Sequence, residues 1–308
     1  MTSPNTSIVL GAGPLGRAIA NQLASDGQTV VVVTRDGRDI GPGIDTRAAD
    51  LSSVADTIAA CESATAIYFC AAPPYHKWQS DFPALQHAAI EAAAATGAVL
   101  VAVENLYGYG RAGHLTEELP LTASTRKGAV RADMSKGLLE THASGRAKCV
   151  AGRATDFFGP GVNVSALGDR FWPAILSGKP IDWVGDPDVE HSFAFLPDLA
   201  KAYIALATTP DMWGSAWHLP ALPPITVREL CVKIVGDDPT PKIRTTPSWI
   251  LRLVGMFQPA AGELIEMRYM FDHGFIIDHS RFDAHGLGVE TRSWDDAIHN
   301  TKAWWQSQ

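Results

Sequence analysis

The glycine-rich segment VLGAGPLGRAIA at residues 9–20 constrains the fold more than any other stretch of the chain. It holds three glycines and the two residues that open the following apolar run: Gly11, Gly13, Pro14, Leu15 and Gly16. Glycines at this spacing allow a tight turn, the close approach of a pyrophosphate, and close packing of a helix on a strand. The pyrophosphate would lie on free backbone N–H groups at the positive end of that helix. The segment therefore predicts a strand–turn–helix unit that binds a dinucleotide.

The first 160 residues alternate short β-branched runs with longer alanine-rich runs, which is the pattern of repeated βαβ units. The short runs are apolar throughout, as in buried parallel strands, and comprise residues 7–10, 29–34, 66–70 and 98–103. The runs between them, and a further one at 127–144, are predicted to be covering helices. The pattern indicates an α/β fold of the Rossmann type, with a doubly wound parallel sheet.

After residue 160 the alternation loosens, and Pro, Gly and Trp become frequent. A strand–turn–helix pattern then returns, so the smaller lobe is expected to be built from insertions. We expect a dinucleotide-binding domain formed by residues 1–160 and about 191–219. A smaller C-terminal substrate lobe is expected from about 161–190 and 220–308.

Composition and charge narrow the range of partners. The 308 residues include 25 Lys and Arg against 33 Asp and Glu, so the net charge of −8 disfavours duplex nucleic acid and anionic membranes. The four cysteines form no C-x-x-C pair and the histidines have no metal-ligand spacing, so no disulfide or metal is expected. No signal-like segment is found, and the longest apolar stretch, roughly 88–103, is interrupted by Glu91 and Gly97. We expect a cytoplasmic protein whose partner is a small molecule.

The end of the second predicted strand bears on the choice of cofactor. A site for NAD usually places Asp or Glu there, whereas this chain has Thr34 followed by Arg35. A guanidinium suits the 2′-phosphate of NADP through paired charge-assisted hydrogen bonds. These residues favour NADP. The neighbouring Asp36 keeps NAD as an alternative, and Arg35 could also be an ordinary solvated charge on the loop.

Short motifs spread along nearly the whole chain include GAGPLG (11–16), ADLSS (49–53), CAAPP (70–74), NLYGYG (105–110), MSKGLLE (134–140), RATDFFGPG (153–161) and FLPDLAKA (195–202). Together they resemble the extended short-chain dehydrogenase/reductase superfamily, especially its atypical NAD-dependent epimerase/dehydratase-like members. The resemblance implies cofactor contacts with the adenine and the nicotinamide ribose from Asp50, Leu51, Ala71, Ala72 and Lys136. Lys136 would hold the ribose hydroxyls, unless it is an ordinary exposed helix residue. Members of the superfamily often dimerise through two helices that correspond here to 83–96 and 127–144, which leaves a homodimer open.

The resemblance also exposes a departure at the catalytic acid. In this superfamily a tyrosine four residues before the lysine gives or takes the substrate proton. Here Ala132 stands at that place, and Val103 stands where a serine or threonine usually assists. A cationic acceptor such as an iminium needs no acid, and otherwise another group must supply the proton. We expect that group on the loops at the carboxyl ends of the strands. Tyr75 or Tyr107 is the preferred proton donor, and His76 is the next candidate. The alternative for each of these residues is that it only packs in the protein.

Two further segments bear on the substrate. KGAVR at 127–131 carries cations one turn before the alanine, so Arg131 would bind an anionic substrate group unless it lies on a solvated helix face. His191 and Ser192 stand where sugar-nucleotide epimerases often carry an arginine for the diphosphate, which argues against a nucleotide-sugar substrate. An apolar pocket, with core packing as the alternative, is suggested by Trp172, Trp183 and Phe193.

Three functions fit these features. The leading hypothesis is an NADP-dependent oxidoreductase that acts on a small, partly apolar carbonyl, imine or alkene compound without the standard Tyr–Lys acid. It depends on the glycine loop together with Arg35 and Lys136. A sensor or scaffold that binds NADP without chemistry is the rival, motivated by Ala132 and Val103. An epimerase or dehydratase with a relocated base is the third.

Overall fold

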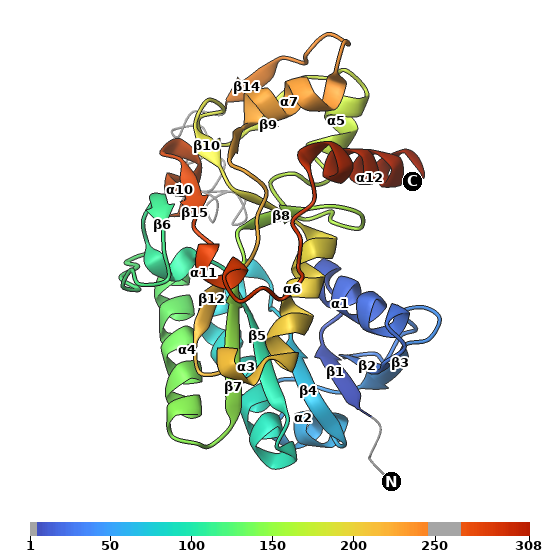
Figure 1. Cartoon of the computed structure of the whole chain (residues 1–308), viewed down its shortest axis with the longest axis vertical. Helices are drawn as coiled ribbons and strands as arrows, with labels where there is room; N and C mark the ends of the chain where they lie inside the picture. Colours follow the sequence, from blue (N-terminus) through green and yellow to red (C-terminus); the bar gives the residue numbers. More distant parts are fainter. Residues whose placement is uncertain (1–4, 246–265) are drawn as a thin grey trace.

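A sheet of seven parallel strands forms the centre of the molecule (Figure 1). The computed structural model describes residues 5–245 and 266–308. From one edge to the other the strands are β12 (Ala216–His218), β7 (Lys148–Arg153), β5 (Val99–Glu104), β4 (Ala64–Phe69), β1 (Thr6–Leu10), β2 (Thr29–Thr34) and β3 (Asp45–Ala48). Because β1 pairs with both β2 and β4, the strand order reverses there, which is where open α/β sheets bind ligands. The predicted α/β fold of the Rossmann type is confirmed.

Helices cover both faces of this sheet because alternate strand residues point to opposite sides. Val9 and Val32 pack in one core cluster with α1 (Pro14–Ser25) and α6 (Leu196–Thr208), which lie side by side in Figure 1. Ile8 and Val31 pack in a second cluster. That cluster is covered by α2 (Val54–Ala60), α3 (Trp78–Thr96) and α4 (Arg126–Ala143).

The predicted strands at 7–10, 29–34, 66–70 and 98–103 correspond to β1, β2, β4 and β5. Two outer strands, β3 and β12, carry no long apolar run, and the sequence pattern does not predict them. The DTRA sequence of β3 is polar because this strand lies at the edge of the sheet and only half of its length is partly covered. Edge strands therefore escape a search for fully apolar runs.

The remaining elements form three small sheets and a third core cluster within the described residues. Their strands are β13 (Ile225–Thr226), β10 (Glu190–His191), β15 (Phe275–Ile277) and β6 (Gly113–Leu115) in one sheet, β11 (Phe193–Phe195) and β8 (Asp156–Phe158) in another, and β14 (Ile243–Thr245) and β9 (Ile181–Trp183) in the last. The helices and turns are η1 (Tyr75–Lys77), η2 (Tyr107–Tyr109), α5 (Trp172–Leu176), η3 (Pro210–Met212), α7 (Val227–Val235), α10 (Tyr269–Asp272), α11 (Ser280–Asp283) and α12 (Trp294–Gln306).

Trp172, Trp183 and Phe193 lie inside this third cluster, and each is less than 5% exposed. The alternative of core packing is therefore confirmed for these three residues, and the prediction that they line an apolar pocket is wrong. The boundaries expected for the two lobes stay a prediction.

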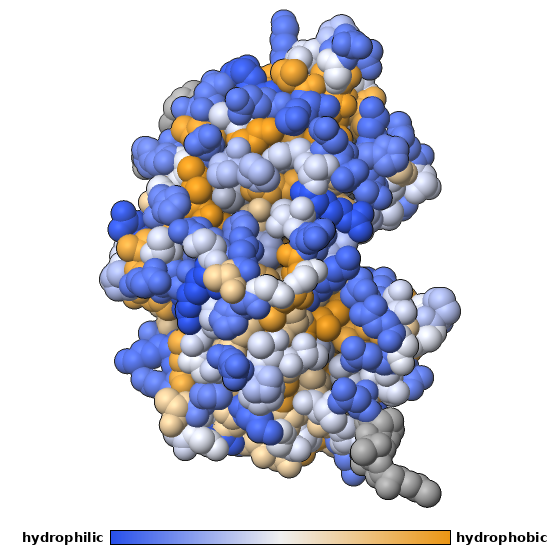
Figure 2. Space-filling view, in the orientation of Figure 1, coloured by the Kyte–Doolittle hydropathy of each residue, from blue (hydrophilic) through white to orange (hydrophobic). Residues whose placement is uncertain are grey.

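The surface is mostly polar, with a notch on the side where α1 lies between the upper and lower parts of the molecule (Figure 2). Among the described residues, no helix is long and apolar enough to cross a membrane. In the same part of the chain, no group of three or more His, Cys, Asp or Glu residues is arranged to hold a metal ion.

Candidate functional site

The loop between β1 and α1 has the geometry of a pyrophosphate cradle. Gly11 has a φ of +103°, and a Cβ there would lie 2.8 Å from the Cα of Ala71. A Cβ on Gly16 would lie 2.1 Å from the carbonyl oxygen of Gly11. A Cβ on Gly13 would meet no atom within 4 Å, and no side chain caps the start of α1. The first N–H groups of α1 therefore face open space in which the pyrophosphate of a dinucleotide fits.

Thr34 ends β2 and uses its hydroxyl locally. The hydroxyl donates to Oδ1 of Asp36 at 3.0 Å and accepts from the N–H of Gly37 at 3.0 Å. The bond from Thr34 is the main cause that lowers the pKa of Asp36. Arg35 is exposed beside this turn. The turn therefore presents one oriented carboxylate and one exposed guanidinium where the sequence places the adenosine half of the cofactor.

Asp50 and Leu51 follow β3, next to this turn. The hydroxyl and N–H of Ser52 both bind the Asp50 carboxylate, at 2.7 and 2.9 Å, and lower its pKa, with a smaller contribution from the charge of Arg35. Leu51 is buried against the sheet. The structure thus brings Arg35 and Asp50 near each other, while their contact with a cofactor stays a prediction.

Two of the predicted catalytic residues meet directly. The hydroxyls of Tyr75 in η1 and Tyr107 in η2 lie 2.5 Å apart, although 32 positions separate them in the sequence. Trp78 packs on both rings, with centroid distances of 4.7 and 6.0 Å, and its Nε1–H donates to the carbonyl of Pro73 at 3.1 Å. Burial raises the pKa of Tyr107 well above its usual value, and the charges of Tyr75 and Asp156 raise it further. Tyr107 therefore keeps its proton at neutral pH. His76, in contrast, is exposed.

Lys136 does not lie with these residues. Its side chain is 74% exposed, and its Nζ lies 3.8 Å from Oε1 of Glu140. Successive residues of an α-helix are rotated by about 100° around the helix axis. Lys136 therefore points about 140° away from Arg131 and about 160° away from Leu138, which are buried on the side that faces the sheet. The prediction that Lys136 holds the cofactor ribose is therefore not supported, and the alternative of an exposed helix residue agrees with the structure.

The inward face of α4 instead carries two buried cations. Lys127 and Arg131 are only 3% and 4% exposed, so the solvated-face alternative is wrong for both. Nζ of Lys127 lies 2.9 Å from Oε2 of Glu266 and 4.8 Å from the ring centroid of Tyr75. Nη2 of Arg131 donates to the carbonyl of Val103, at the end of β5, at 2.8 Å. The K-x-x-x-R spacing is the signal that could have identified them, because residues four apart share a helix face.

A buried polar network holds α4 in this rotation. Arg153 donates from Nε to Glu104 at 3.2 Å, from Nη2 to Ser135 at 2.9 Å, and from Nη1 to Tyr109 at 2.7 Å. Ser135 of α4 donates to Glu104 at 2.9 Å, and the Tyr109 hydroxyl bonds Nε2 of His218 at 2.7 Å. Burial lowers the pKa of His218 to about 4, so its ring is neutral. The network ties α4 to β5, β7 and β12 and keeps Lys136 outside.

Asp156 and His191 form a second polar pair near the tyrosines. Oδ2 of Asp156 lies 2.9 Å from Nε2 of His191, whose ring stacks on Phe271 at 5.0 Å and 1°. Nδ1 of His191 is buried without a hydrogen-bond partner, which is less costly for a bare nitrogen than for an N–H, so Nε2 carries the proton. The Asp156 side chain is 22% exposed. His191 therefore orients a carboxylate whose charge reaches Tyr107.

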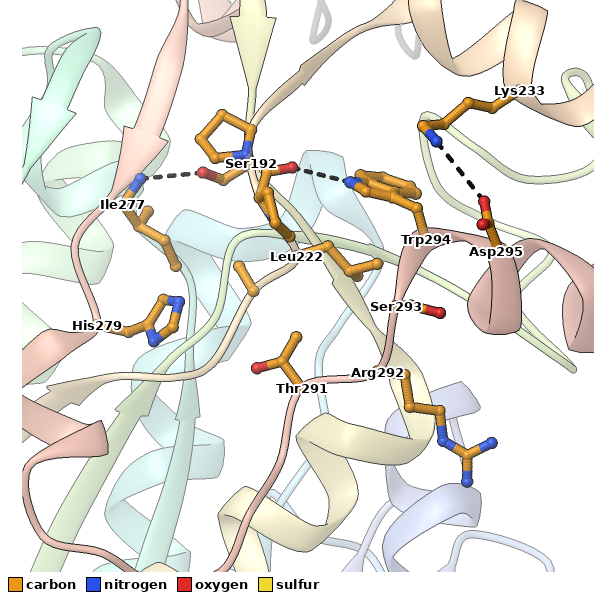
Figure 3. Close-up of a pocket in the computed structure, with 13 residues that line it drawn as sticks. Ser192, Leu222, Lys233, Ile277, His279, Thr291, Arg292, Ser293, Trp294 and Asp295 are labelled. Carbon is orange, nitrogen blue, oxygen red and sulfur yellow. Dashed lines mark hydrogen bonds and ion pairs between the residues drawn. The ribbon is translucent and has the colours of Figure 1, made fainter.

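A separate cavity of about 660 Å³ lies between Ser192, Leu222, His279 and the start of α12 (Figure 3). In the figure, Trp294 lies along one wall, and its Nε1–H donates to the carbonyl of Pro223. None of the residues predicted from the sequence as site residues lines it. The cavity is thus distinct from the cluster around Tyr75 and Tyr107.

Comparison with known families settles what kind of protein carries this arrangement. A model of the NAD dependent epimerase/dehydratase family matches residues 7–216, which is more than half of the chain. The chain belongs to this family. The match includes the glycine loop, both tyrosines and α4. It confirms the resemblance to the NAD-dependent epimerase/dehydratase-like proteins and supports an enzyme of this type.

Solved structures share the whole fold of this family member at low sequence identity. A dTDP-glucose 4,6-dehydratase from Bacillus anthracis str. Ames in complex with NAD has a TM-score of 0.79 at 14% identity, covering 99% of this chain and 97% of that one. A UDP-glucuronic acid 4-epimerase from Bacillus cereus in complex with NAD has a TM-score of 0.78 at 14% identity, with 98% and 99% covered. A UDP-N-acetylglucosamine 4-epimerase from Methanobrevibacter ruminantium M1, in complex with UDP-N-acetylmuramic acid, has a TM-score of 0.77 at 17% identity, with 100% of both chains covered. No curated protein sequence matches the chain significantly.

Proposed function

We propose that the chain is an NAD(P)-dependent oxidoreductase that acts on a small, partly apolar carbonyl, imine or alkene compound, with the hydroxyl pair of Tyr75 and Tyr107 as its proton donor. The 2.5 Å contact between these hydroxyls carries the proposal. It lies beyond the carboxyl ends of β4 and β5, where open α/β sheets bind ligands. The exposed Arg35 favours NADP, and the NAD bound to solved relatives keeps NAD as the alternative.

The bound nicotinamide supplies or accepts the hydride. Tyr107 and Tyr75 hold the proton that accompanies it, and the raised pKa of Tyr107 keeps the phenol protonated until charge develops on the substrate. When one hydroxyl gives up its proton, the hydrogen bond to the other spreads the negative charge over both. The Lys127 ammonium, 4.8 Å from the ring centroid of Tyr75, stabilises that charge.

Asp156 limits the substrates that this site accepts. The carboxylate of Asp156 repels phosphate and accepts a hydrogen bond from a hydroxyl or amine. This supports a substrate without a diphosphate at that point, although the solved relatives include sugar-nucleotide enzymes. Asp156 also favours a second candidate function, an epimerase or dehydratase in which this carboxylate is the relocated base.

Cofactor consumption by purified protein tests the proposal. We expect NADPH to be oxidised with at least one member of a panel of small ketones, cyclic imines and activated alkenes. Replacing both phenols, in Tyr75→Phe/Tyr107→Phe, should lower kcat by about 10²–10⁴-fold and leave the cofactor Kd unchanged. Tyr203→Phe is the matched control, because that buried hydroxyl donates to the Gly152 carbonyl and lies outside the pair.

The outcomes separate the candidate functions. Wild-type turnover by the double variant contradicts the role of the tyrosines. Cofactor that binds but is not consumed, together with deuterium exchange from solvent into a sugar nucleotide, favours the epimerase or dehydratase. Binding with neither reaction favours the sensor.

A further inference from the structure

Arg131 is a buried cation whose hydrogen-bonding capacity is mostly unused. Its Nη2 donates to the Val103 carbonyl, and its guanidinium carbon lies 4.9 Å from the ring centroid of Phe82. Nε is fully buried without a hydrogen-bond partner, and within the described residues Nη1 has none either. In the same part of the chain, no carboxylate lies within ion-pair distance of this guanidinium. Burial lowers the pKa of Arg131, which is the electrostatic cost of this placement.

The nearest acidic group is already engaged. Glu104 follows Val103 in β5, and its Oε2 binds Ser135 and Arg153. Its Oε1 is buried and has no hydrogen-bond partner, so even this free oxygen does not bind Arg131. The protein therefore keeps a guanidinium at the end of β5 with donors that its own side chains do not satisfy.

The topology indicates which part of a dinucleotide reaches Arg131. With the pyrophosphate on the first turn of α1, one half of the molecule extends over β2 and β3 and the other over β4 and β5. The second half meets the chain at Ala71, which contacts the Gly11 position, and at Val103, where Arg131 is bound. The polar groups of that half next to the nicotinamide are the two adjacent ribose hydroxyls. A planar guanidinium with parallel N–H groups suits two adjacent oxygen acceptors.

We propose that Arg131 binds the two hydroxyls of the nicotinamide-side ribose, the role that the motif resemblance implied for Lys136. The proposal rests on the dinucleotide site of the proposed function. Lys127, one turn earlier on the same face, then lies at the tyrosine pair, so that α4 presents one cation to the cofactor and one to the proton donors. η2 packs closely on α4 between these two cations, since a Cβ on Gly108 would lie 3.4 Å from the Ala132 backbone.

Calorimetric titration with ADP and ADP-ribose tests the assignment, because ADP-ribose carries the second ribose and ADP does not. We expect the wild type to bind ADP-ribose about tenfold more tightly than ADP, since hydrogen bonds to a charged donor are the strong ones. Arg131→Met should abolish this difference while leaving the ADP affinity within about twofold of wild type. Arg131→Gln is a second variant that keeps an amide donor for the Val103 carbonyl, and it should abolish the difference as well. Lys136→Met is the control and should retain the full preference.

Each outcome decides between the alternatives. A preference for ADP-ribose that persists in both Arg131 variants, or that is lost in Lys136→Met, overturns the proposal. If the wild type binds neither ligand, the dinucleotide site itself fails, and the proposed function fails with it. If the wild type binds ADP but shows no preference for ADP-ribose, the dinucleotide site stands and the Arg131 assignment is wrong.

Discussion

Alanine at Gly13 and alanine at Gly16 should separate cofactor binding from folding, because the two glycines have opposite surroundings. Gly13 has φ −67° and ψ 176°, which any residue adopts, and a Cβ there meets no atom within 4 Å. Gly13→Ala should therefore change the free energy of unfolding by no more than about 1 kcal/mol. A Cβ on Gly16 lies 2.1 Å from the Gly11 oxygen and 3.3 Å from the Cβ of Cys70, so the backbone must shift. Gly16→Ala should cost about 1–3 kcal/mol.

These energies convert into measurable quantities. For 308 residues, an unfolding entropy of about 2.1 cal/mol/K per residue makes 1 kcal/mol equivalent to about 1.5 °C in Tm. Gly16→Ala should melt about 2–5 °C below wild type, and Gly13→Ala within about 1.5 °C of it. The Gly13 methyl would occupy the place of the pyrophosphate, and losing one charge-assisted hydrogen bond of about 1.5–3 kcal/mol weakens binding by about 10–100-fold.

Circular dichroism melts and calorimetric titration with NAD and NADP measure the two effects separately. Wild-type affinity in a folded Gly13→Ala protein would show that the loop is not the pyrophosphate site. An equal loss of Tm in both variants would show that the open space at Gly13 does not exist in solution.

Lys127, Asp156 and His218 each give a further test. Lys127→Met should lower the free energy of unfolding in urea by about 3 kcal/mol, because it leaves the Glu266 carboxylate without its 2.9 Å partner, and adding Glu266→Gln should recover part of the loss. Asp156→Asn should tighten the binding of UDP about fivefold in calorimetry, since one charge at about 8 Å in an effective dielectric of about 40 is worth about 1 kcal/mol; weaker UDP binding contradicts the repulsion. His218 titrates near 6.5 when unfolded and at about 4 when folded, so its contribution to stability is complete above about pH 6.5 and is lost as the pH falls toward about 4. Urea unfolding at pH 7 and pH 4.5 should show a loss that is smaller in His218→Gln than in wild type by roughly 2 kcal/mol.

The central sheet could be predicted because its inner strands carry a physical signature. Strands buried on both faces must be apolar throughout, and those at 29–34 and 98–103 are. The edge strand β3 has no such requirement, since only one side of it pairs with the sheet. The glycine loop was also predictable, because each glycine answers a local steric need that the structure reproduces at Gly11 and Gly16.

The tyrosine pair was predictable only in part. The rule that ligands bind beyond the carboxyl ends of strands places Tyr75 and Tyr107 in the same region. No local pattern predicts that their hydroxyls meet at 2.5 Å, because the contact depends on how η1 and η2 pack around Trp78. The same holds for Glu266, which reaches Lys127 across 139 positions of the chain.

The rotation of α4 shows why a motif alone does not tell which side of the helix Lys136 occupies. The MSKGLLE motif aligns Lys136 by its letters, but burial decides which side of a helix faces the sheet. Met134 and Leu138 are the apolar residues of that side, and positions three to four residues earlier on the same side lead back to Arg131 and Lys127. Charged residues at such positions contradict the apolar pattern, so the pattern alone assigns them to solvent. A charge that continues an apolar helix face is costly to bury without a partner, and it is retained where a ligand or a reacting group supplies one. Lys127 and Arg131 both break the periodicity on which the rest of the fold depends; Lys127 has Glu266 as its partner, and the partner proposed for Arg131 is the cofactor ribose.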